Sequence, residues 1–245
     1  MELKSRVALV TGSAKRVGKA LALALAEQGC HIVVHYGRSA AAAGDTAAQI
    51  RQAGVNAWTI SADLGDEAAV QALVPQALEM AGRLDILVNN ASIFPPEDFL
   101  SATSESWDRN MMVNLKAPFL LSQAFARALP PERQGKIINL LDVAAMRPGN
   151  HHFSYTISKV GLEGLTKAMA VALAPHNIQV NGIALGAILP NVNDDPALFD
   201  RLTQKIPARR TGDPQDVVKA LLYLLRDADF VTGEIIRVDG GSHLV

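Results

Sequence analysis

The sequence predicts an α/β fold with a doubly wound parallel sheet of seven strands, flanked by helices and forming a single domain over residues 1–245. Short apolar runs recur along the chain without polar alternation, which is typical of strands buried on both faces of a parallel sheet. Longer stretches with helical periodicity separate these runs, an order that favours parallel strands with crossover helices. With 245 residues, 49% of them hydrophobic, the chain can bury the core of one such domain.

The expected strands and helices alternate along the chain. We expect strands at 7–10, 31–36, 56–61, 84–89, 136–141, 178–185 and 234–239. We expect helices at 17–28, 66–81, 104–129, 154–174 and 214–226. Gly29 is a predicted helix stop, and Asp213 before Pro214 is a predicted N-cap. Pro75 and Pro118 fall inside helical patterns, where we expect kinks.

Composition excludes several classes of protein. The net charge is −1, the isoelectric point is about 6.6, and no run of Lys or Arg exceeds two residues, which argues against a nucleic-acid partner. The single cysteine, Cys30, excludes an intrachain disulfide and a Cys-rich metal site, and fits a reducing compartment. No stretch approaches the roughly 20 apolar residues of a membrane-spanning helix. We therefore expect a cytoplasmic protein without a membrane partner.

A glycine-containing turn, TGSAKRVG at 11–18, follows the first expected strand and opens a helix. Glycine lets the backbone approach a pyrophosphate, and amide groups at a helix N-terminus carry partial positive charge. The turn predicts a dinucleotide site at Gly12, Ser13, Val17 and Gly18. Because it has two glycines and not three, the turn alone also fits an ordinary strand-to-helix connection.

The end of the second strand favours NADPH over NADH. The sequence HYGRS at 35–39 lacks the Asp or Glu that would bind the ribose of an unphosphorylated cofactor. A guanidinium, a hydroxyl and two nearby cations suit a phosphate instead, although Arg38 could also be a solvated loop charge. The predicted contacts are Lys15, Arg16, His35, Tyr36, Arg38 and Ser39.

The ends of the third and fourth strands extend the predicted cofactor site. Asp63 and Leu64 end the third strand, where they could cover the adenine edge. Asn90, Ala91 and Ser92 end the fourth, where small and amide side chains can border a cofactor that lies across strand ends.

Tyr155 and Lys159 lie four residues apart on an expected helix, so the phenol and the ammonium share one face. A nearby cation can hold down the pKa of a phenol and make it a usable proton donor. Asp142 ends an apolar run twelve residues before Tyr155. Alone, the pair could equally be a packed tyrosine and a solvated lysine, but a neighbouring dinucleotide site favours catalysis.

These motifs resemble the short-chain dehydrogenases/reductases over essentially the whole chain. The matching features are T-G at 11–12, N-N-A at 89–91, Asn114 in a long helix, Tyr155 with Lys159, and V-D-G-G at 238–241. The resemblance implies a Rossmann-type oxidoreductase in which Tyr155 donates a proton, Lys159 holds the nicotinamide ribose and Asn114 anchors a water. It also implies cofactor contacts at Gly186 and Ile188, and a homotetramer.

Within that family the chain looks most like the pteridine reductases, including bacterial dihydromonapterin and dihydrofolate reductases. Arg16 stands in place of the usual middle glycine, HYGRS follows the second strand, and Asp142 occupies the position normally held by serine. This resemblance implies an NADPH-dependent enzyme of folate metabolism that reduces a ring C=N. The implied substrate-binding residues are Arg16, Ser92, Phe94, Asp142 and Tyr155, with the Phe94 ring stacked on a pterin.

Alternatives remain open at this point. An ionised Asp142 can only accept hydrogen bonds, which suits amino N–H groups, whereas serine can donate to a carbonyl. Asp142 could instead form a structural salt bridge. The rival functions are a carbonyl reductase of a 3-oxoacyl thioester or small ketone, and a non-catalytic nucleotide-sensing scaffold, against which Tyr155 and Lys159 argue. His151 and His152 lack metal-ligand spacing, so we predict no metal, and we expect a substrate loop at about 186–210.

Overall fold

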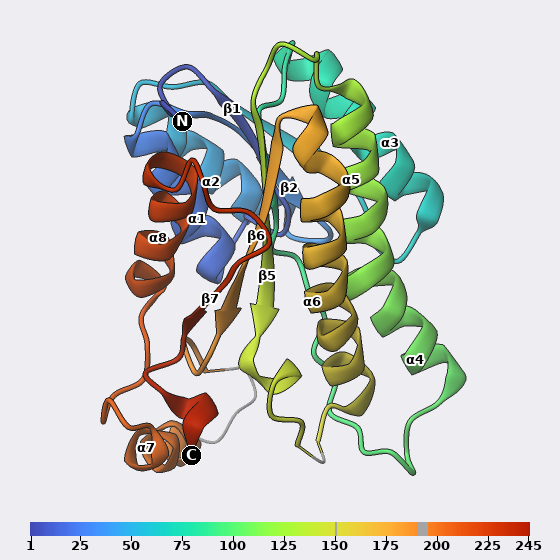
Figure 1. Cartoon of the computed structure of the whole chain (residues 1–245), viewed down its shortest axis with the longest axis vertical. Coiled ribbons are helices and arrows are strands. Elements are labelled where there is room, and N and C mark those ends of the chain that lie inside the picture. The colour runs from blue at the N-terminus through green and yellow to red at the C-terminus, as the bar shows by residue number, and fades with distance from the viewer. Residues whose placement is uncertain (150, 191–195) are drawn as a thin grey trace.

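A parallel sheet of seven strands lies at the centre of the computed structural model, which describes residues 1–149, 151–190 and 196–245 (Figure 1). The strand order is β3-β2-β1-β4-β5-β6-β7, and every neighbouring pair is parallel. The strands are β1 Val7–Val10, β2 His31–Tyr36, β3 Ala57–Ser61, β4 Ile86–Asn89, β5 Gly135–Asp142, β6 Ile178–Leu185 and β7 Ile235–Val238. The predicted fold class is confirmed. The strand order reverses between β1 and β4, which opens a crevice at the carboxyl ends of these strands.

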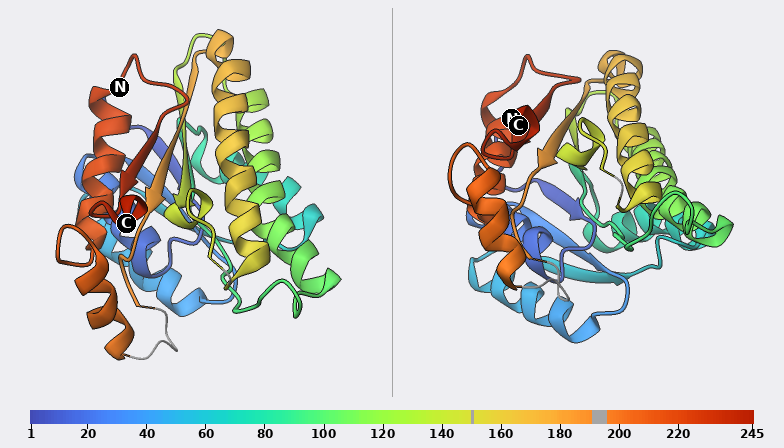
Figure 2. Two further views of the ribbon diagram at one scale, coloured as in Figure 1. Left: turned by 60° about the horizontal axis from the view of Figure 1, so that its bottom comes forward. Right: turned by 90° about the horizontal axis from the view of Figure 1, so that it is seen from below.

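Helices cover both faces of the sheet (Figure 2). The α-helices are α1 Arg16–Glu27, α2 Ala40–Gln52, α3 Glu67–Ala81, α4 Ser104–Met111, α5 Ala117–Ala128, α6 Phe153–Leu173, α7 Pro196–Lys205 and α8 Pro214–Leu222. Side chains alternate along β1, so that Ala8 and Val10 pack with α1, α2 and α8, whereas Val7 and Leu9 pack with α3, α5 and α6. Within the described ranges, no helix is long and apolar enough to cross a membrane.

The expected helix at 104–129 is divided by a π-helical turn at Met112–Lys116, between α4 and α5. Pro118 lies just after this turn, and because proline has no N–H, the carbonyl of Asn114 lacks its usual i+4 donor. The predicted disturbance near Pro118 is therefore a local change of helix type, whereas α3 continues through Pro75.

Helix α7 lies inside the segment 186–210, which we expected to be a loop. The sequence held a signal for it, because Asp195–Pro196 repeats the Asp213–Pro214 pair. At the second pair the predicted cap is confirmed, since the Asp213 side chain accepts from the Gln215 N–H at 2.8 Å.

A chain of buried amides, here called the amide ladder, joins the sheet to α6. Asn89 Nδ2 on β4 donates to Asn139 Oδ1 on β5 at 2.8 Å, and Asn139 Nδ2 donates to Thr166 Oγ1 on α6 at 2.8 Å. All three side chains are buried. Each such bond contributes about 1 kcal/mol, and leaving one buried partner unpaired costs about 1–3 kcal/mol. The ladder therefore fixes α6 against the sheet.

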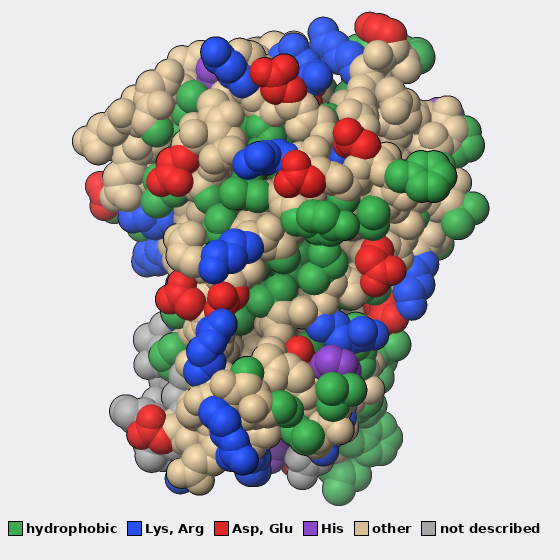
Figure 3. All heavy atoms as spheres, turned by 60° about the vertical axis from the view of Figure 1, so that its left-hand side comes forward, with side chains coloured by type: hydrophobic (Ala, Val, Ile, Leu, Met, Phe, Trp, Pro, Cys, Tyr) green, Lys and Arg blue, Asp and Glu red, His purple; other side chains and the backbone are tan. Residues whose placement is uncertain are grey.

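The surface shown in Figure 3 carries acidic and basic side chains interspersed with one another. This distribution agrees with a net charge of −1. A mixed surface of this kind does not produce the broad positive field that attracts a nucleic-acid backbone.

Candidate active site

The structure brings Asp142, at the end of β5, against Tyr155 in the first turn of α6. The Tyr155 hydroxyl donates to Asp142 Oδ2 at 2.7 Å, and Asp142 Oδ1 accepts from the Ala144 N–H at 2.8 Å. Among the described residues, no cationic side chain lies within ion-pair distance of Asp142. Within the part of the chain that the structure describes, this carboxylate therefore contacts the phenol and a turn amide and forms no salt bridge.

Lys159 lies one turn further along α6 and is 3% exposed. Its ammonium donates to the Leu140 carbonyl at 2.8 Å and sits 5.6 Å from the centre of the Tyr155 ring. Burial lowers the pKa of Lys159 to about 8, and the Asp142 carboxylate opposes that decrease.

The pKa of Tyr155 differs from our expectation. Burial, followed by the charge of Asp142 and the hydrogen bond to it, raises this pKa well above the ordinary value of a phenol. We expected Lys159 to lower this pKa, but burial of the phenol and the neighbouring Asp142 carboxylate determine its direction. In the protein alone, the phenol therefore keeps its proton.

Asn114, in the π-helical turn, connects the end of β4 to α6. Its Oδ1 accepts from the Ile93 N–H at 2.9 Å and from Ser92 Oγ at 3.1 Å. Its Nδ2 donates to Ser158 Oγ at 3.1 Å, and Ser158 Oγ donates to the Tyr155 carbonyl at 2.6 Å. The side chain thus holds the catalytic helix in place. We did not predict Ser158, although a serine three residues after Tyr155 shares its helix face.

Phe94, predicted to stack on a substrate, lies beside Tyr155, and a histidine covers one of its faces. The rings of Phe94 and His152 are stacked with centres 3.6 Å apart, and the Tyr155 ring meets Phe94 edge-on at 4.4 Å. Phe94 is 39% exposed. A flat substrate could stack on this face of Phe94 only by displacing His152. Sequence spacing gave no signal for this contact.

Glu97 caps the N-terminus of α6 from a distant loop. Its Oε1 accepts from the Ser154 N–H at 2.9 Å, and the other carboxylate oxygen accepts from Ser106 Oγ on α4. Burial raises the pKa of Glu97, but the hydrogen bonds from Ser106 and Ser154 lower it more, so the pKa lies below its usual range. His152, at the N-cap position, has a left-handed backbone conformation, and its side chain makes no capping hydrogen bond. Glu97 therefore supplies the missing cap.

The phosphate turn, residues 11–18, is closed in a way that only glycine permits. A Cβ added to Gly18 would lie 2.5 Å from the Gly12 carbonyl oxygen and 2.5 Å from Asn90 Nδ2, and Gly12 has a φ of +63°. Asn90 Nδ2 donates to the Thr11 carbonyl at 2.8 Å, and the Asn90 and Ala91 amides both donate to Thr11 Oγ1 at 2.9 Å. These bonds seat the turn on the end of β4.

Two amides of the turn, which we expected to face a pyrophosphate, are engaged by His35. The Gly12 N–H donates to His35 Nδ1 at 3.0 Å, and the Ser13 N–H donates to the His35 carbonyl at 3.0 Å. The Val17 and Gly18 amides, at the N-terminus of α1, have no partner among the described residues. A phosphate at this turn would therefore meet those two amides.

The predicted basic residues surround the turn. Lys15 and Arg16 are exposed, and the Arg16 guanidinium donates to the carbonyls of Pro190 at 2.8 Å and Leu189 at 3.4 Å. Arg38 is exposed after β2. Arg16 thus connects the phosphate turn to the start of the predicted substrate loop, whose residues 191–195 lie outside the described residues.

Other side chains of β2 and β3 border the same end of the sheet. Tyr36 is partly buried, and the Ser39 side chain makes no capping bond to α2, although Ser39 is its N-cap. Asp63 accepts from the Gly65 N–H at 2.8 Å and from Arg109 Nη2 at 3.1 Å. We did not predict Arg109, which reaches Asp63 from α4.

The remaining predicted residues are more deeply placed. Leu64 and Ile188 are buried. A Cβ on Gly186 would lie 2.8 Å from Asp239 Cα, so glycine lets β6 pass close to the end of β7. Their contact with a cofactor stays a prediction.

Comparisons with known proteins agree on the family and differ on the substrate. A family model described as Enoyl-(Acyl carrier protein) reductase matches residues 12–243. A 3-oxoacyl-(acyl-carrier-protein) reductase from Synechocystis sp. is 36% identical, covering 98% of this chain and 97% of that protein. A 2-dehydro-3-deoxy-D-gluconate 5-dehydrogenase from Escherichia coli is 37% identical, covering 98% and 96%.

Among solved structures, the FolM alternative dihydrofolate reductase 1 from Brucella canis, complexed with NADP, superposes with a TM-score of 0.94. It is 36% identical, and the match covers 100% of this chain and 96% of that one. The fold and the chain length are therefore common to relatives whose names give three different kinds of substrate.

Proposed function

We propose that this chain, which belongs to the short-chain dehydrogenase/reductase family of NAD(P)-dependent oxidoreductases, is an NADPH-dependent reductase of pteridines. The reaction would take a dihydropterin or dihydrofolate to the tetrahydro form. The observation that carries the proposal is the carboxylate of Asp142, 2.7 Å from the Tyr155 hydroxyl.

The phosphate turn fits NADPH. A Cβ at Gly18 would collide with the Gly12 carbonyl and the Asn90 amide, so glycine keeps the turn closed and leaves the Val17 and Gly18 amides at the N-terminus of α1 for a pyrophosphate. Lys15, Arg16 and Arg38 supply exposed positive charge at the same end of the sheet, where no carboxylate follows β2. The similarity to an NADP complex supports the same cofactor. When bound, the cofactor supplies the hydride.

The residues of the site supply the proton and the orientation. Reduction of a ring C=N adds a hydride to carbon and a proton to nitrogen, and the Tyr155 hydroxyl, which keeps its proton in the protein alone, is the proposed donor. An ionised Asp142 accepts hydrogen bonds, so it can hold the amino N–H groups of a pterin while it orients the phenol. The Phe94 ring, once His152 is displaced from its face, would offer a flat apolar surface for the pterin.

Reduction of a 3-oxoacyl thioester is the second candidate, because a relative at 36% identity is named for that activity. A ketone substrate presents a carbonyl oxygen, which needs a hydrogen-bond donor, whereas a pterin also presents amino N–H groups, which need an acceptor. An ionised carboxylate cannot donate to that oxygen. The Asp142 side chain therefore favours the pterin.

The direct test is NADPH oxidation by the purified protein, with dihydrobiopterin, dihydromonapterin, dihydrofolate and a 3-oxoacyl thioester assayed in parallel. We expect turnover of at least one pterin or folate. Turnover of the thioester alone would refute the proposal.

Asp142→Ser separates a substrate role from a structural one. We expect pterin kcat/KM to fall about 100-fold, or roughly 2.7 kcal/mol, while the Kd of NADPH changes less than about twofold. Asp66→Ser is a matched control. Asp66 Oδ1 accepts from the Ala68 N–H at 2.9 Å, the same contact two residues ahead that Asp142 Oδ1 makes with the Ala144 N–H. Equal losses of turnover and NADPH affinity in Asp142→Ser would mean that Asp142 is structural.

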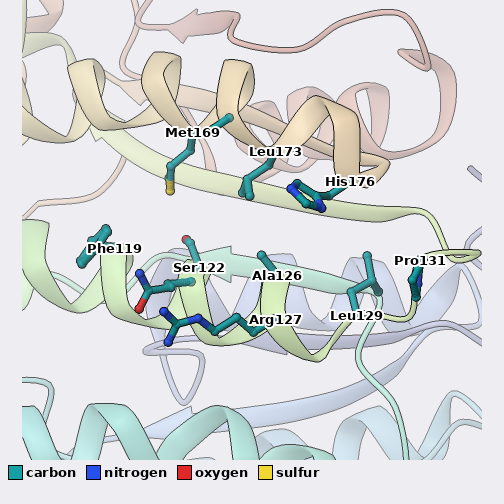
Figure 4. A pocket seen from close by; sticks show the side chains of 11 residues that line it. Phe119, Ser122, Ala126, Arg127, Leu129, Pro131, Met169, Leu173 and His176 are labelled. Atoms are coloured by element: carbon teal, nitrogen blue, oxygen red, sulfur yellow. The ribbon is translucent and has the colours of Figure 1, made fainter.

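We also propose that the enzyme assembles as a homotetramer through α5 and α6. A cavity of about 560 Å³ lies between these helices, with Met169 and Leu173 pointing across it toward α5 (Figure 4). Phe119 and Val171 on the same two helices are 40% and 79% exposed, which leaves apolar area available for another copy. Light scattering after gel filtration tests this, and Phe119→Glu should reduce the assembly size. A wild-type monomer would refute it.

A further inference from the structure

We propose that His35 is a positioning residue of the dinucleotide site, which shapes the phosphate turn without touching the phosphate. Its ring holds the Gly12 amide and its carbonyl holds the Ser13 amide, so the free amides of Val17 and Gly18 form the anion-binding face. The inference rests on the nucleotide cofactor of the proposed function and is independent of the pterin.

The hydrogen bonds require one tautomer of His35. The Gly12 N–H is a donor, so Nδ1 must accept, and in a neutral imidazole the other nitrogen then carries the proton. That nitrogen, Nε2, lies 3.0 Å from the Ala62 carbonyl, which can only accept. His35 is 2% exposed, and burial lowers its pKa, which favours the neutral ring. Both nitrogens are thus committed to the protein.

The positions of the two bonds explain why they matter. Gly12 adopts a φ of +63°, and because glycine has no Cβ, its backbone amide is less restricted than that of another residue. The bond to Nδ1 fixes the direction of this amide, and the adjacent Ser13 side chain is fixed by its bond to the Val10 carbonyl at 2.7 Å. Through Nε2 the same ring is tied to the end of β3. One side chain therefore holds the turn between β1, β2 and β3.

Two substitutions separate the two ring nitrogens. In His35→Asn, the side-chain oxygen lies near the former Nδ1 and can still accept from Gly12. In His35→Gln, the longer amide reaches toward the former Nε2 and can donate to Ala62, but it leaves the Gly12 N–H unpaired. A purely structural role would weaken both variants alike, whereas the proposed role predicts rescue by asparagine alone.

The chain offers a matched control in His31, at the other end of β2. His31 Nδ1 accepts from the Asn56 N–H at 3.0 Å, the same type of bond at the edge of the sheet away from the phosphate turn. His31→Gln therefore removes a comparable bond without altering the cofactor site.

The test is titration calorimetry of the full-length protein with NADP+, together with the melting temperature of each variant. We expect His35→Gln to weaken binding at least tenfold, His35→Asn less than threefold, and His31→Gln not measurably. Equal weakening by the two His35 variants, or unchanged binding by His35→Gln, would overturn the proposal. Pterin turnover does not enter this test, so a protein that binds NADP+ as expected but reduces no pterin would refute only the proposed function.

A second measurement does not depend on variants that fold. The coupling across the Gly12 N–H···Nδ1 bond can be measured by NMR in the wild-type protein, with and without NADP+. A coupling that persists in the complex supports the positioning role. Its loss on binding would show that the Gly12 amide turns to the phosphate, and would overturn the proposal.

Discussion

The phosphate turn and the Tyr155 site lie at the same edge of the sheet but are held by different kinds of contact. In the phosphate turn, glycines, main-chain amides and an uncharged imidazole fix a shape. Around Tyr155, a buried phenol and a buried ammonium lie beside a partly exposed carboxylate, and burial shifts the pKa values of Tyr155 and Lys159.

The difference indicates how each region responds to substitution. Changes in the phosphate turn should alter cofactor affinity, because the backbone conformation of the turn determines which of its amides can bind a phosphate. Changes around Tyr155 should alter rate and pH dependence, because protonation states decide the chemistry.

Tyr155→Phe should have the largest effect. The ring keeps its edge-on contact with Phe94, but the proton donor is lost, so we expect kcat to fall about 10²–10⁴-fold. Calorimetry should show NADPH affinity within about twofold of wild type. A fall in kcat smaller than tenfold would identify another group as the donor.

Gly18→Ala should act on affinity instead. The new Cβ would meet the Gly12 carbonyl oxygen and the Asn90 amide at 2.5 Å, and an overpacking cost of about 1–3 kcal/mol that falls on the binding-competent turn corresponds to a Kd raised about 5- to 150-fold. Gly44→Ala is the control, because a Cβ there meets nothing within 4 Å inside α2. That variant should raise the melting temperature, through about 0.5–1 kcal/mol of helix propensity, and leave the Kd unchanged. Equal Kd values for the two variants would contradict the assignment of the turn.

The pH dependence should follow Lys159. Its pKa is lowered to about 8, so the ammonium is present below that pH and is lost above it. If the ammonium supports the reaction, kcat/KM should fall above pH 8, approaching tenfold per pH unit. In Asp142→Asn the carboxylate that raises this pKa is gone, so any residual activity should decline at a lower pH than in wild type. A decline that does not move would mean that another group titrates.

Glu97→Gln should have the smallest effect. The amide oxygen can still cap Ser154, but the negative charge at the N-terminus of α6 is lost, which costs about 0.3–1 kcal/mol. We therefore expect kcat to change less than about fivefold, with a small decrease in melting temperature. A loss greater than about 30-fold would show that Glu97 takes a direct part in the reaction.

Much of the fold could be predicted from the sequence, because buried parallel strands leave uninterrupted β-branched runs. The predicted strand bounds agree with the structure to within two residues. The site was predicted where chemistry lies in short motifs: Tyr155 with Lys159 on one helix face, and the glycines of the phosphate turn.

The rest depends on contacts between segments distant in the chain. The stacking of His152 on Phe94, the cap from Glu97 and the engagement of both His35 nitrogens have no periodicity that a sequence could reveal. The pKa of Tyr155 was predicted in the wrong direction, because helix spacing places Lys159 nearby but reveals neither the burial of the phenol nor its hydrogen bond to Asp142.

The amide ladder has a consequence for how this enzyme can vary. Thr166 lies eleven residues beyond Tyr155 on α6. The buried hydrogen bond from Asn139 to Thr166 therefore fixes the position of the whole helix along the sheet. A shift by a single residue would translate the phenol about 1.5 Å and turn it through about 100°. The loops at this end of the sheet can therefore change in sequence to accept other ligands while the Tyr155 phenol keeps its position, because buried contacts of α6 determine that position.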